Sequence, residues 1–268
     1  MASKKQKRIS VEKINGEFEK YNPDKLRSSL KNVGADEATI SNILKKTEKI
    51  LYDGIKTKKL FSFIHNELDK TKPSSGLKYN LRKAIFELRI HGGFVFEKFV
   101  GRVLEKKGYD IKMNQIIKGK NVTHEIDVSA TKPISGKNEK LMVEVKHHQK
   151  KGITESIQTA LYVYARFLEV KEFYTRPMLV TNTKFSNQVI KYSKGQGIRL
   201  MGWKYPNKDS LEKNIEKYHL YPITILGLSK EQTRKYLNKG IITIKELKEQ
   251  KSISKKTKEK IEKLISKD

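Results

Sequence analysis

The chain has 268 residues, and its 58 Lys and Arg against 30 Asp and Glu give a formal net charge of +28 at pH 7. Its length and its 36% hydrophobic fraction allow two or three domains with separate cores. The absence of cysteine excludes disulfides and argues against a zinc finger. Because no stretch approaches the roughly 18 apolar residues of a membrane span, we expect a cytoplasmic protein without a membrane partner.

The positive charge is spread along the whole chain and is not confined to one tail. A folded protein with this charge repels itself, and a polyanion lying along it relieves the repulsion. DNA is therefore the partner that the composition favours. A ribosomal or RNA partner, an anionic membrane surface and a lysine-rich proteome would give the same excess, so they stay open as alternatives.

The first part of the chain predicts a β-hairpin followed by helices. Apolar and polar residues alternate on both sides of Asn15-Gly16 in "ISVEKINGEFEKY", which is a strong hairpin signal. The first helix is expected to begin with Asn22 as its N-cap and Pro23 in its first turn. A second helix covers "DEATISNILKKTEKILYDG", a third is expected to be capped by Thr57, and a fourth covers "GLKYNLRKAIFELRI". Residues 1–91 thus form one expected domain.

The middle of the chain predicts an α/β domain with a mixed sheet over residues 92–206. An amphipathic helix, "FVFEKFVGRVLEKKGYD", comes first, and the three strands "IKMNQIIKG", "HEIDVSA" and "KLMVEVKHH" follow it. After them come the helix "GITESIQTALYVYARFLEV", the strand "RPMLVTN", the helix "FSNQVIKYSKG" and the strand "IRLMGW". We expect a linker at 207–222 and a small helical domain at 223–268. The expected fold class is therefore an α/β multidomain protein.

Two of these strands carry carboxylates. Glu144 and Lys146 are two residues apart, so they share one face of a strand. Antiparallel pairing through the intervening turn would bring Asp127 beside Glu144. Carboxylates that meet suit Mg²⁺ or Mn²⁺, and a metal-held water next to a lysine can attack a phosphodiester. An ordinary exposed strand face is the alternative interpretation.

The order D, then E-x-K, after a helix that carries a glutamate, resembles the PD-(D/E)xK nucleases, and "FEKFVGRVLEKKGYD" with the segments after it is similar to the Mrr-type restriction endonuclease domain. The resemblance implies a Mg²⁺-dependent DNA endonuclease of restriction or defence type. It implies that Glu97, Asp127 and Glu144 bind the metal. Gln158 and Tyr162 match a Q-x-x-x-Y element, so the implied catalytic residues are Asp127, Glu144, Lys146, Glu97 and Gln158.

Residues 9 to 90 resemble an ATP-cone, a nucleotide-sensing module. The motifs V-x-K-x-x-G, D-K-L, D-G-I-K-T and Y-x-L-x-x-A-I occur in the order of that family, although Phe61 stands where the family often has a histidine. The resemblance implies ATP or dATP as an allosteric ligand, bound by Val11, Lys13, Glu19, Lys25 and Thr57. Lysines supply cations for phosphates, and a helix start adds free amides.

The stretch "ITILGLSKEQTRKYLNKGIITIKEL" resembles a degenerate helix-hairpin-helix module. Lys230, Lys235 and Lys239 would then contact DNA phosphates. A docking or homo-oligomerisation unit is an equal alternative for these helices. For the whole protein, the leading alternative function is a non-catalytic, nucleotide-responsive DNA-binding regulator.

Overall fold

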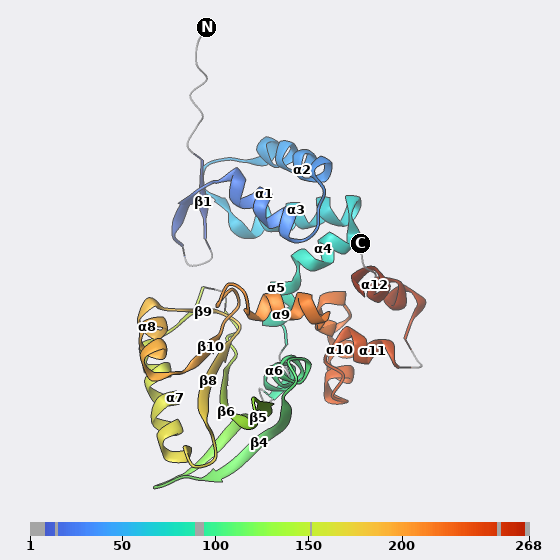
Figure 1. The fold of residues 1–268 in the computed structure, drawn as a ribbon. Helices are drawn as coiled ribbons and strands as arrows, with labels where there is room; N and C mark the ends of the chain where they lie inside the picture. Colours follow the sequence, from blue (N-terminus) through green and yellow to red (C-terminus); the bar gives the residue numbers. More distant parts are fainter. Residues whose placement is uncertain (1–8, 14–15, 89–93, 151, 251–252, 266–268) are drawn as a thin grey trace. The chain divides into compact units, whose positions relative to one another are not determined.

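The computed structural model describes residues 9–13, 16–88, 94–150, 152–250 and 253–265. The chain divides into two compact units, of which the first comprises Met1–Leu81 with Lys256–Asp268 and the second Arg82–Lys255. Figure 1 labels the helices and strands of both units. Within the described residues, no helix is both long and apolar enough to cross a membrane.

The first unit is a small sheet with helices. Strands β1 (Ser10–Glu12) and β2 (Phe18–Lys20) pair antiparallel, and β3 (Ile55–Lys56) pairs parallel with β1. The predicted hairpin is confirmed, while Asn15 of its turn lies outside the described residues. The helices are α1 (Pro23–Asn32), α2 (Glu37–Ile50), α3 (Thr57–Thr71), α4 (Pro73–Tyr79) and, from the C-terminal end of the chain, α12 (Lys255–Ile265). The apolar faces of α1, α2 and α3 bury a core that includes Leu30, Ile40, Ile43 and Leu68.

Of two helix starts predicted in this unit, one is correct and one is wrong. The predicted start of α1 is confirmed, because Oδ1 of Asn22 accepts hydrogen bonds from the amides of Asp24 and Lys25 at 2.8 and 3.2 Å. The predicted cap at Thr57 is wrong. Thr57 is the first residue of α3, and its hydroxyl donates to the Glu12 carbonyl oxygen at 2.9 Å. Its hydroxyl therefore connects the helix to strand β1.

The fourth predicted helix is two helices in the structure. Helix α4 begins earlier than expected, at Pro73, and α5 (Leu81–Phe86) follows after a break at Asn80. The Asn80 amide nitrogen lies 2.7 Å from His65 Nε2, so its side chain makes a hydrogen bond outside the helix. The backbone amide of Asn80 donates to the Leu77 carbonyl oxygen at 3.0 Å, a short turn that ends α4 at this residue.

The second unit contains a five-stranded mixed sheet in the order β10-β8-β6-β5-β4. The antiparallel strands are β4 (Asp110–Lys118), β5 (Thr123–Ile134) and β6 (Lys137–Lys146), and β8 (Arg176–Thr181) and β10 (Arg199–Met201) run parallel to β6. A separate two-stranded sheet joins β7 (Thr154–Glu155) and β9 (Lys184–Phe185). The predicted α/β order and mixed sheet are confirmed.

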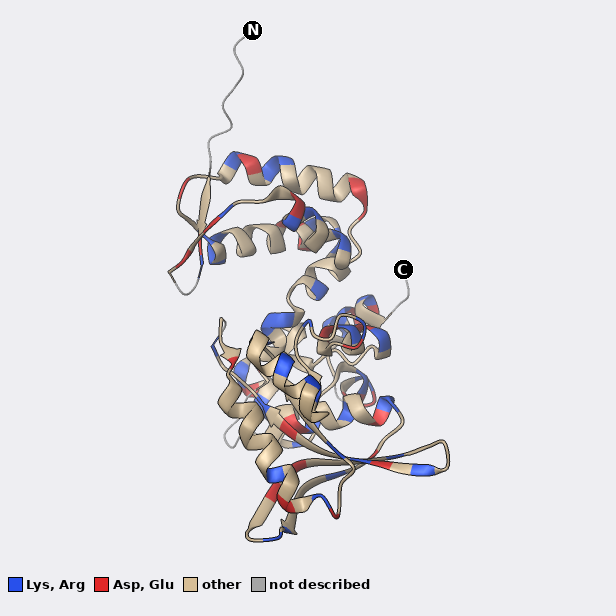
Figure 2. Ribbon diagram, turned by 60° about the vertical axis from the view of Figure 1, so that its left-hand side comes forward, with Lys and Arg blue, Asp and Glu red and all other residues tan. Residues whose placement is uncertain are grey.

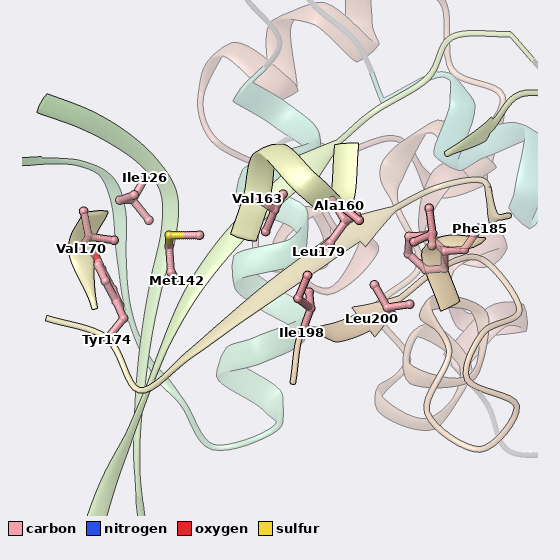
Figure 3. Close-up of a cluster of buried hydrophobic side chains, with 11 residues drawn as sticks. Ile126, Met142, Ala160, Val163, Val170, Tyr174, Leu179, Phe185, Ile198 and Leu200 are labelled. Atoms are coloured by element: carbon pink, nitrogen blue, oxygen red, sulfur yellow. The ribbon is translucent and has the colours of Figure 1, made fainter. Parts of the chain in front are cut away.

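Helices cover both faces of this sheet. Helix α6 (Phe94–Lys106) packs against β4, β5 and β6, whereas α7 (Ile157–Val170) and α8 (Asn187–Gln196) cover the other face (Figure 1). The core under α7 and α8 combines residues from helices and strands (Figure 3), among them Ile126, Met142, Ala160, Val163 and Leu179. This two-sided burial makes the sheet the rigid frame of the second unit.

The segments after the sheet are helical. Residues 207–222, expected as a linker with a short helix, contain α9 (Leu211–Tyr218), whose Leu211 and Ile215 are buried. The short helix η1 (Ile223–Leu226), α10 (Lys230–Asn238) and α11 (Ile244–Lys248) follow. Nε of Arg102 on α6 donates to Oε1 of Glu246 on α11 at 2.8 Å, so this bond joins α11 to α6.

Replacing Phe99 of α6 by alanine tests the core, because this side chain is 0% exposed. We expect Phe99→Ala to lower the free energy of unfolding by about 3–5 kcal/mol through lost burial and a residual cavity. Urea denaturation measures the change. Phe173→Ala is the matched control, since Phe173 is 47% exposed and its loss should cost less than about 0.5 kcal/mol. Equal effects of the two substitutions would contradict the packing described.

Candidate active site

The central sheet separates into two parts at Asp127 and Glu144. The pairing of β5 with β6 ends at Val128 opposite Val143, and the same register places Asp127 across from Glu144 as the next residues. Beyond this point β5 stays paired with β4, and β6 stays paired with β8. Backbone groups that face the separation cannot bond to the other strand, so side chains have to satisfy them.

The regular alternation of β5 side chains between the two faces of the sheet is also interrupted at Asp127. Ile126 belongs to the core under α7, and the Ser129 hydroxyl bonds to the hydroxyl of Tyr174 in the same core. Residues three apart in a regular strand point to opposite faces, so the alternation is broken between them. Asn114, across from Asp127 in β4, has a left-handed backbone with φ 49°, a conformation that asparagine tolerates better than most residues. Asp127 therefore occupies an irregularity that two paired strands share.

The Asp127 carboxylate takes the place of a strand acceptor. Its Oδ2 accepts a hydrogen bond from the Val145 amide at 2.7 Å. Burial, together with the neighbouring carboxylates of Glu144 and Glu97, raises the pKa of Asp127 to about 7. Asp127 thus lies where negative charge is poorly compensated.

The Glu144 carboxylate, by contrast, is compensated twice. This residue is only 4% exposed, and its Oε1 lies 2.6 Å from Nζ of Lys146. Its Oε2 pairs with the guanidinium of Arg166 on α7. Two cations therefore balance one buried carboxylate, which makes its burial tolerable.

Lys146 is held in its charged form. Burial alone would lower the pKa of Lys146, but the hydrogen bond and charge of Glu144 outweigh burial and keep that pKa above its ordinary value. An ammonium group orients a water molecule or stabilises negative charge, and it does not act as a base. This arrangement therefore favours orientation of a water molecule by Lys146 over its deprotonation.

The other predicted site residues lie at different distances from this centre. Burial raises the pKa of Glu97, which accepts a hydrogen bond from Asn114 at 3.2 Å and feels the charges of Glu125 and Glu144. Tyr162 is 54% exposed, and its ring centroid lies 5.3 Å from the Arg166 guanidinium. Gln158 is exposed one turn earlier on α7, and no hydrogen bond or ion pair in the described part of the chain joins it to the other site residues.

The end of β6 is anchored on two sides directly after Lys146. His147 stacks on Phe96 with ring centroids 4.7 Å apart, and its Nε2 lies 3.0 Å from the Ile85 carbonyl oxygen. His148 bonds to the buried carboxylate of Glu155 and exchanges backbone hydrogen bonds with the side chain of Asn182. These contacts fix the strand end that presents Lys146.

The carboxylates suit a divalent cation in their chemistry, although they do not form a closed ligand cluster. No group of three or more His, Asp or Glu side chains among the described residues is placed to hold a metal ion. Glu97, Asp127 and Glu144 nevertheless repel one another, since Glu144 raises the pKa of both other groups. A hard cation with oxygen ligands would offset this repulsion. In its chemistry this set of carboxylates suits Mg²⁺ or Mn²⁺, and Asp127 is the carboxylate whose charge is least compensated.

Comparisons with known proteins agree with this architecture. The restriction endonuclease family model Mrr_cat matches residues 89–204. An uncharacterized protein of Archaeoglobus fulgidus is 41% identical over 144 residues, which are 53% of this chain and 80% of that protein. The chain belongs to the family of this archaeal protein. The chain is also similar to the solved structure of AF1548, a protein of unknown function, with 35% identity and a TM-score of 0.52. The match covers 68% of this chain and 96% of the AF1548 chain.

Residues 89–204 thus form a restriction endonuclease domain, as the resemblance implied. The matched segment contains all of the predicted catalytic residues, Glu97, Asp127, Glu144, Lys146 and Gln158. The ATP-cone resemblance concerns residues before this domain, so it stays a prediction. Sequence analysis missed Arg166, although its spacing of four and eight residues from Tyr162 and Gln158 places it on the same helix face.

A second candidate site lies in the first unit. A cavity of about 260 Å³ is lined by all five predicted nucleotide-binding residues, Val11, Lys13, Glu19, Lys25 and Thr57. Phe61 and Tyr79 also line it and stack with ring centroids 4.8 Å apart. Hydrogen bonds from Lys25 and Lys13 lower the pKa of Glu19 to about 2. The cavity therefore combines an aromatic wall with two lysines that share one carboxylate.

The raised pKa of Asp127 predicts a pH-dependent stability without divalent cations. The folded protein holds the Asp127 proton more tightly than the unfolded chain, whose carboxyl has the ordinary pKa of 3.8. Asp127 therefore adds to the free energy of unfolding below about pH 4. This contribution is lost as the pH rises to about 7. Asp127→Asn cannot ionise and retains an acceptor for the Val145 amide, so its stability should depend less on pH.

Urea denaturation at several pH values between 4 and 8, in the presence of a chelator, measures this difference. Asp110→Asn is the matched control, since Asp110 is an exposed carboxylate on β4, and this variant should keep the wild-type pH dependence. A wild-type pH dependence in Asp127→Asn would contradict the described environment of Asp127.

Proposed function

We propose that this protein is a metal-dependent DNA endonuclease of restriction or defence type that hydrolyses phosphodiester bonds. The observation that carries the proposal is the meeting of Asp127, Glu144 and Lys146 where β5 and β6 separate. These groups supply a carboxylate with little compensation, a carboxylate with a fixed orientation and an ammonium group. A structural ion pair on a strand would not need the first of these.

Each residue has a distinct proposed role. Asp127 and Glu144 would hold Mg²⁺ or Mn²⁺ with Glu97 in support, and the bound cation would supply water activation and charge stabilisation. Lys146 orients the attacking water and stabilises the negative charge that develops on the phosphate. Gln158 and Tyr162, which share an exposed face of α7, are proposed to contact the DNA or the water around the metal.

DNA as the substrate is supported by the charge of the whole chain. Lys and Arg outnumber Asp and Glu by 58 to 30, and Figure 2 shows them on helices and strands of both units. Binding through many such cations releases counterions and weakens steeply with added salt. Lys230, Lys235 and Lys239 of the C-terminal helices are proposed as further phosphate contacts.

Cleavage of plasmid DNA in the presence of Mg²⁺ tests the proposed active site. We expect Asp127→Asn and Lys146→Met each to reduce the cleavage rate by about 10²-fold or more, because each removes stabilisation of the transition state. Lys137→Met is the matched control, since Lys137 is an exposed lysine at the other end of β6. The control should cut at the wild-type rate, and the assignment would be wrong if all variants cut equally.

We also propose that ATP or dATP regulates the nuclease by binding to the cavity of the first unit. The aromatic pair Phe61 and Tyr79 offers a flat apolar surface for a base. Lys13 and Lys25 supply cations for phosphates, although Glu19 already pairs with both of them. Binding regulates activity only where the nucleotide prefers one of two states of the protein.

Isothermal titration calorimetry with ATP and dATP tests the nucleotide proposal. Lys13→Gln should raise the dissociation constant by about fivefold or more, because it removes a charged partner of the phosphates. Lys31→Gln, an exposed lysine of α1 that does not line the cavity, is the matched control and should bind as the wild type does. Absence of binding to the wild type would remove the proposed regulation without affecting the nuclease assignment.

One observation favours the alternative of a non-catalytic, nucleotide-responsive DNA-binding regulator. Both carboxylate oxygens of Glu144 already have cationic partners, so this side chain is balanced without a metal. Thermal denaturation separates the two candidates. A nuclease of the proposed kind should be stabilised by Mg²⁺, and Glu144→Gln should remove that stabilisation, whereas a regulator should show neither effect.

A further inference from the structure

Arg166 of α7 bridges the two strands where the sheet separates. One guanidinium nitrogen pairs with Oε2 of Glu144 on β6, and the other donates to the Glu125 carbonyl oxygen on β5. Its side chain is only 9% exposed, and the Tyr162 ring lies 5.3 Å from the guanidinium. The Nε atom is buried without a hydrogen-bond partner among the described residues. An arginine is thus buried to make two particular bonds.

We propose that Arg166 is a positioning residue of the active site, which holds β5 and β6 at a fixed separation and orients the carboxylate of Glu144. This assignment rests on the proposed nuclease function of the same site. Arg166 is not a catalytic residue in this proposal, because its guanidinium contacts Glu144 and the backbone and acts on the substrate only through them.

The geometry explains why an arginine stands at this position. The guanidinium is planar and presents several donors in a rigid fork, so it can bond to a carboxylate and a carbonyl oxygen on two strands at the same time. A lysine has a single ammonium group on a flexible stem. The buried Glu144 carboxylate requires a donor, and the Glu125 carbonyl oxygen on the other strand accepts the second one.

The consequence for catalysis follows from the two oxygens of Glu144. Arg166 occupies Oε2, which leaves Oε1 to Lys146 at 2.6 Å. Without Arg166, the carboxylate could rotate and Lys146 could take either oxygen, so neither group would keep its orientation. Small displacements of reacting groups lower rates strongly, even where binding is little changed. Loss of Arg166 should therefore affect the chemical step more than DNA affinity.

Single-turnover cleavage and DNA binding by Arg166 variants test the proposal. Arg166→Met should lower the cleavage rate by about 10²-fold, while the dissociation constant for DNA changes by less than about threefold. Arg166→Lys retains the charge beside Glu144 but lacks the fork that bonds to both strands, so it should recover only part of that rate. Cleavage by Arg166→Met within threefold of the wild-type rate, or cleavage by Arg166→Lys at the full wild-type rate, would overturn the proposal.

The chain offers a matched control in Arg199 of β10, which pairs with another glutamate of β6. Arg199 makes two ion-pair contacts with Glu139 of β6, at 2.8 and 3.2 Å, and it is also partly buried. Arg199→Met removes an equivalent arginine and glutamate pair away from the active site, so it should lose stability and still cut within about threefold of the wild-type rate. A loss of rate equal to that of Arg166→Met would mean that Arg166 serves stability alone.

A double-mutant cycle in urea unfolding tests the contact independently of activity. Each single substitution, Arg166→Met or Glu144→Gln, should increase the equilibrium constant for unfolding. The double variant should increase it by a factor about ten or more times smaller than the product of the two single increases. Arg199→Met combined with Glu144→Gln should equal the product of its single effects. Independent effects in the first pair would overturn the positioning role. If the wild type cuts no DNA, the nuclease proposal fails, and the cycle still decides whether Arg166 holds Glu144.

Discussion

The separation of β5 from β6 after Val128 and Val143 is the constraint on which the candidate active site depends. Continued pairing would place a backbone hydrogen-bond ladder between Asp127 and Glu144. Because the strands separate, the Val145 amide turns to the Asp127 carboxylate and the Glu125 carbonyl turns to Arg166. The polar side chains of the site thus satisfy the backbone groups that an irregular sheet leaves without partners.

Electrostatic compensation then gives the two facing carboxylates different properties. Glu144 is deeply buried but has Lys146 and Arg166 as partners. Asp127 has a backbone amide and carboxylate neighbours, and its pKa rises to about 7. A group whose ionisation is unfavourable gains most from an added cation. This difference between the two residues is the reason why we propose a metal-assisted reaction and not a passive ion pair.

In the first unit, too, one carboxylate is balanced by two cationic side chains. Glu19 pairs with Lys13 and Lys25 beside the cavity of the first unit, so cationic groups are present but already have a partner. Phosphates of a nucleotide would exchange one anionic partner for another. The affinity would then depend on how well Phe61, Tyr79 and the rest of the apolar wall contact a base.

The sequence by itself determined the order of helices and strands in the endonuclease domain, the hairpin of the first unit, the N-cap at Asn22, and the placement of Glu144 with Lys146 on one strand face. These features depend on residues close together in the chain, where periodicity and capping preferences act directly. Only the tertiary structure decided that Thr57 bonds to β1, that the helix breaks at Asn80, that β5 changes faces at Asp127 and that Arg166 joins Glu125 to Glu144. The contacts of Arg166 connect residues 41 and 22 positions apart. Such contacts follow from how α7 packs on a sheet that has already separated, and local sequence patterns carry no signal for that packing.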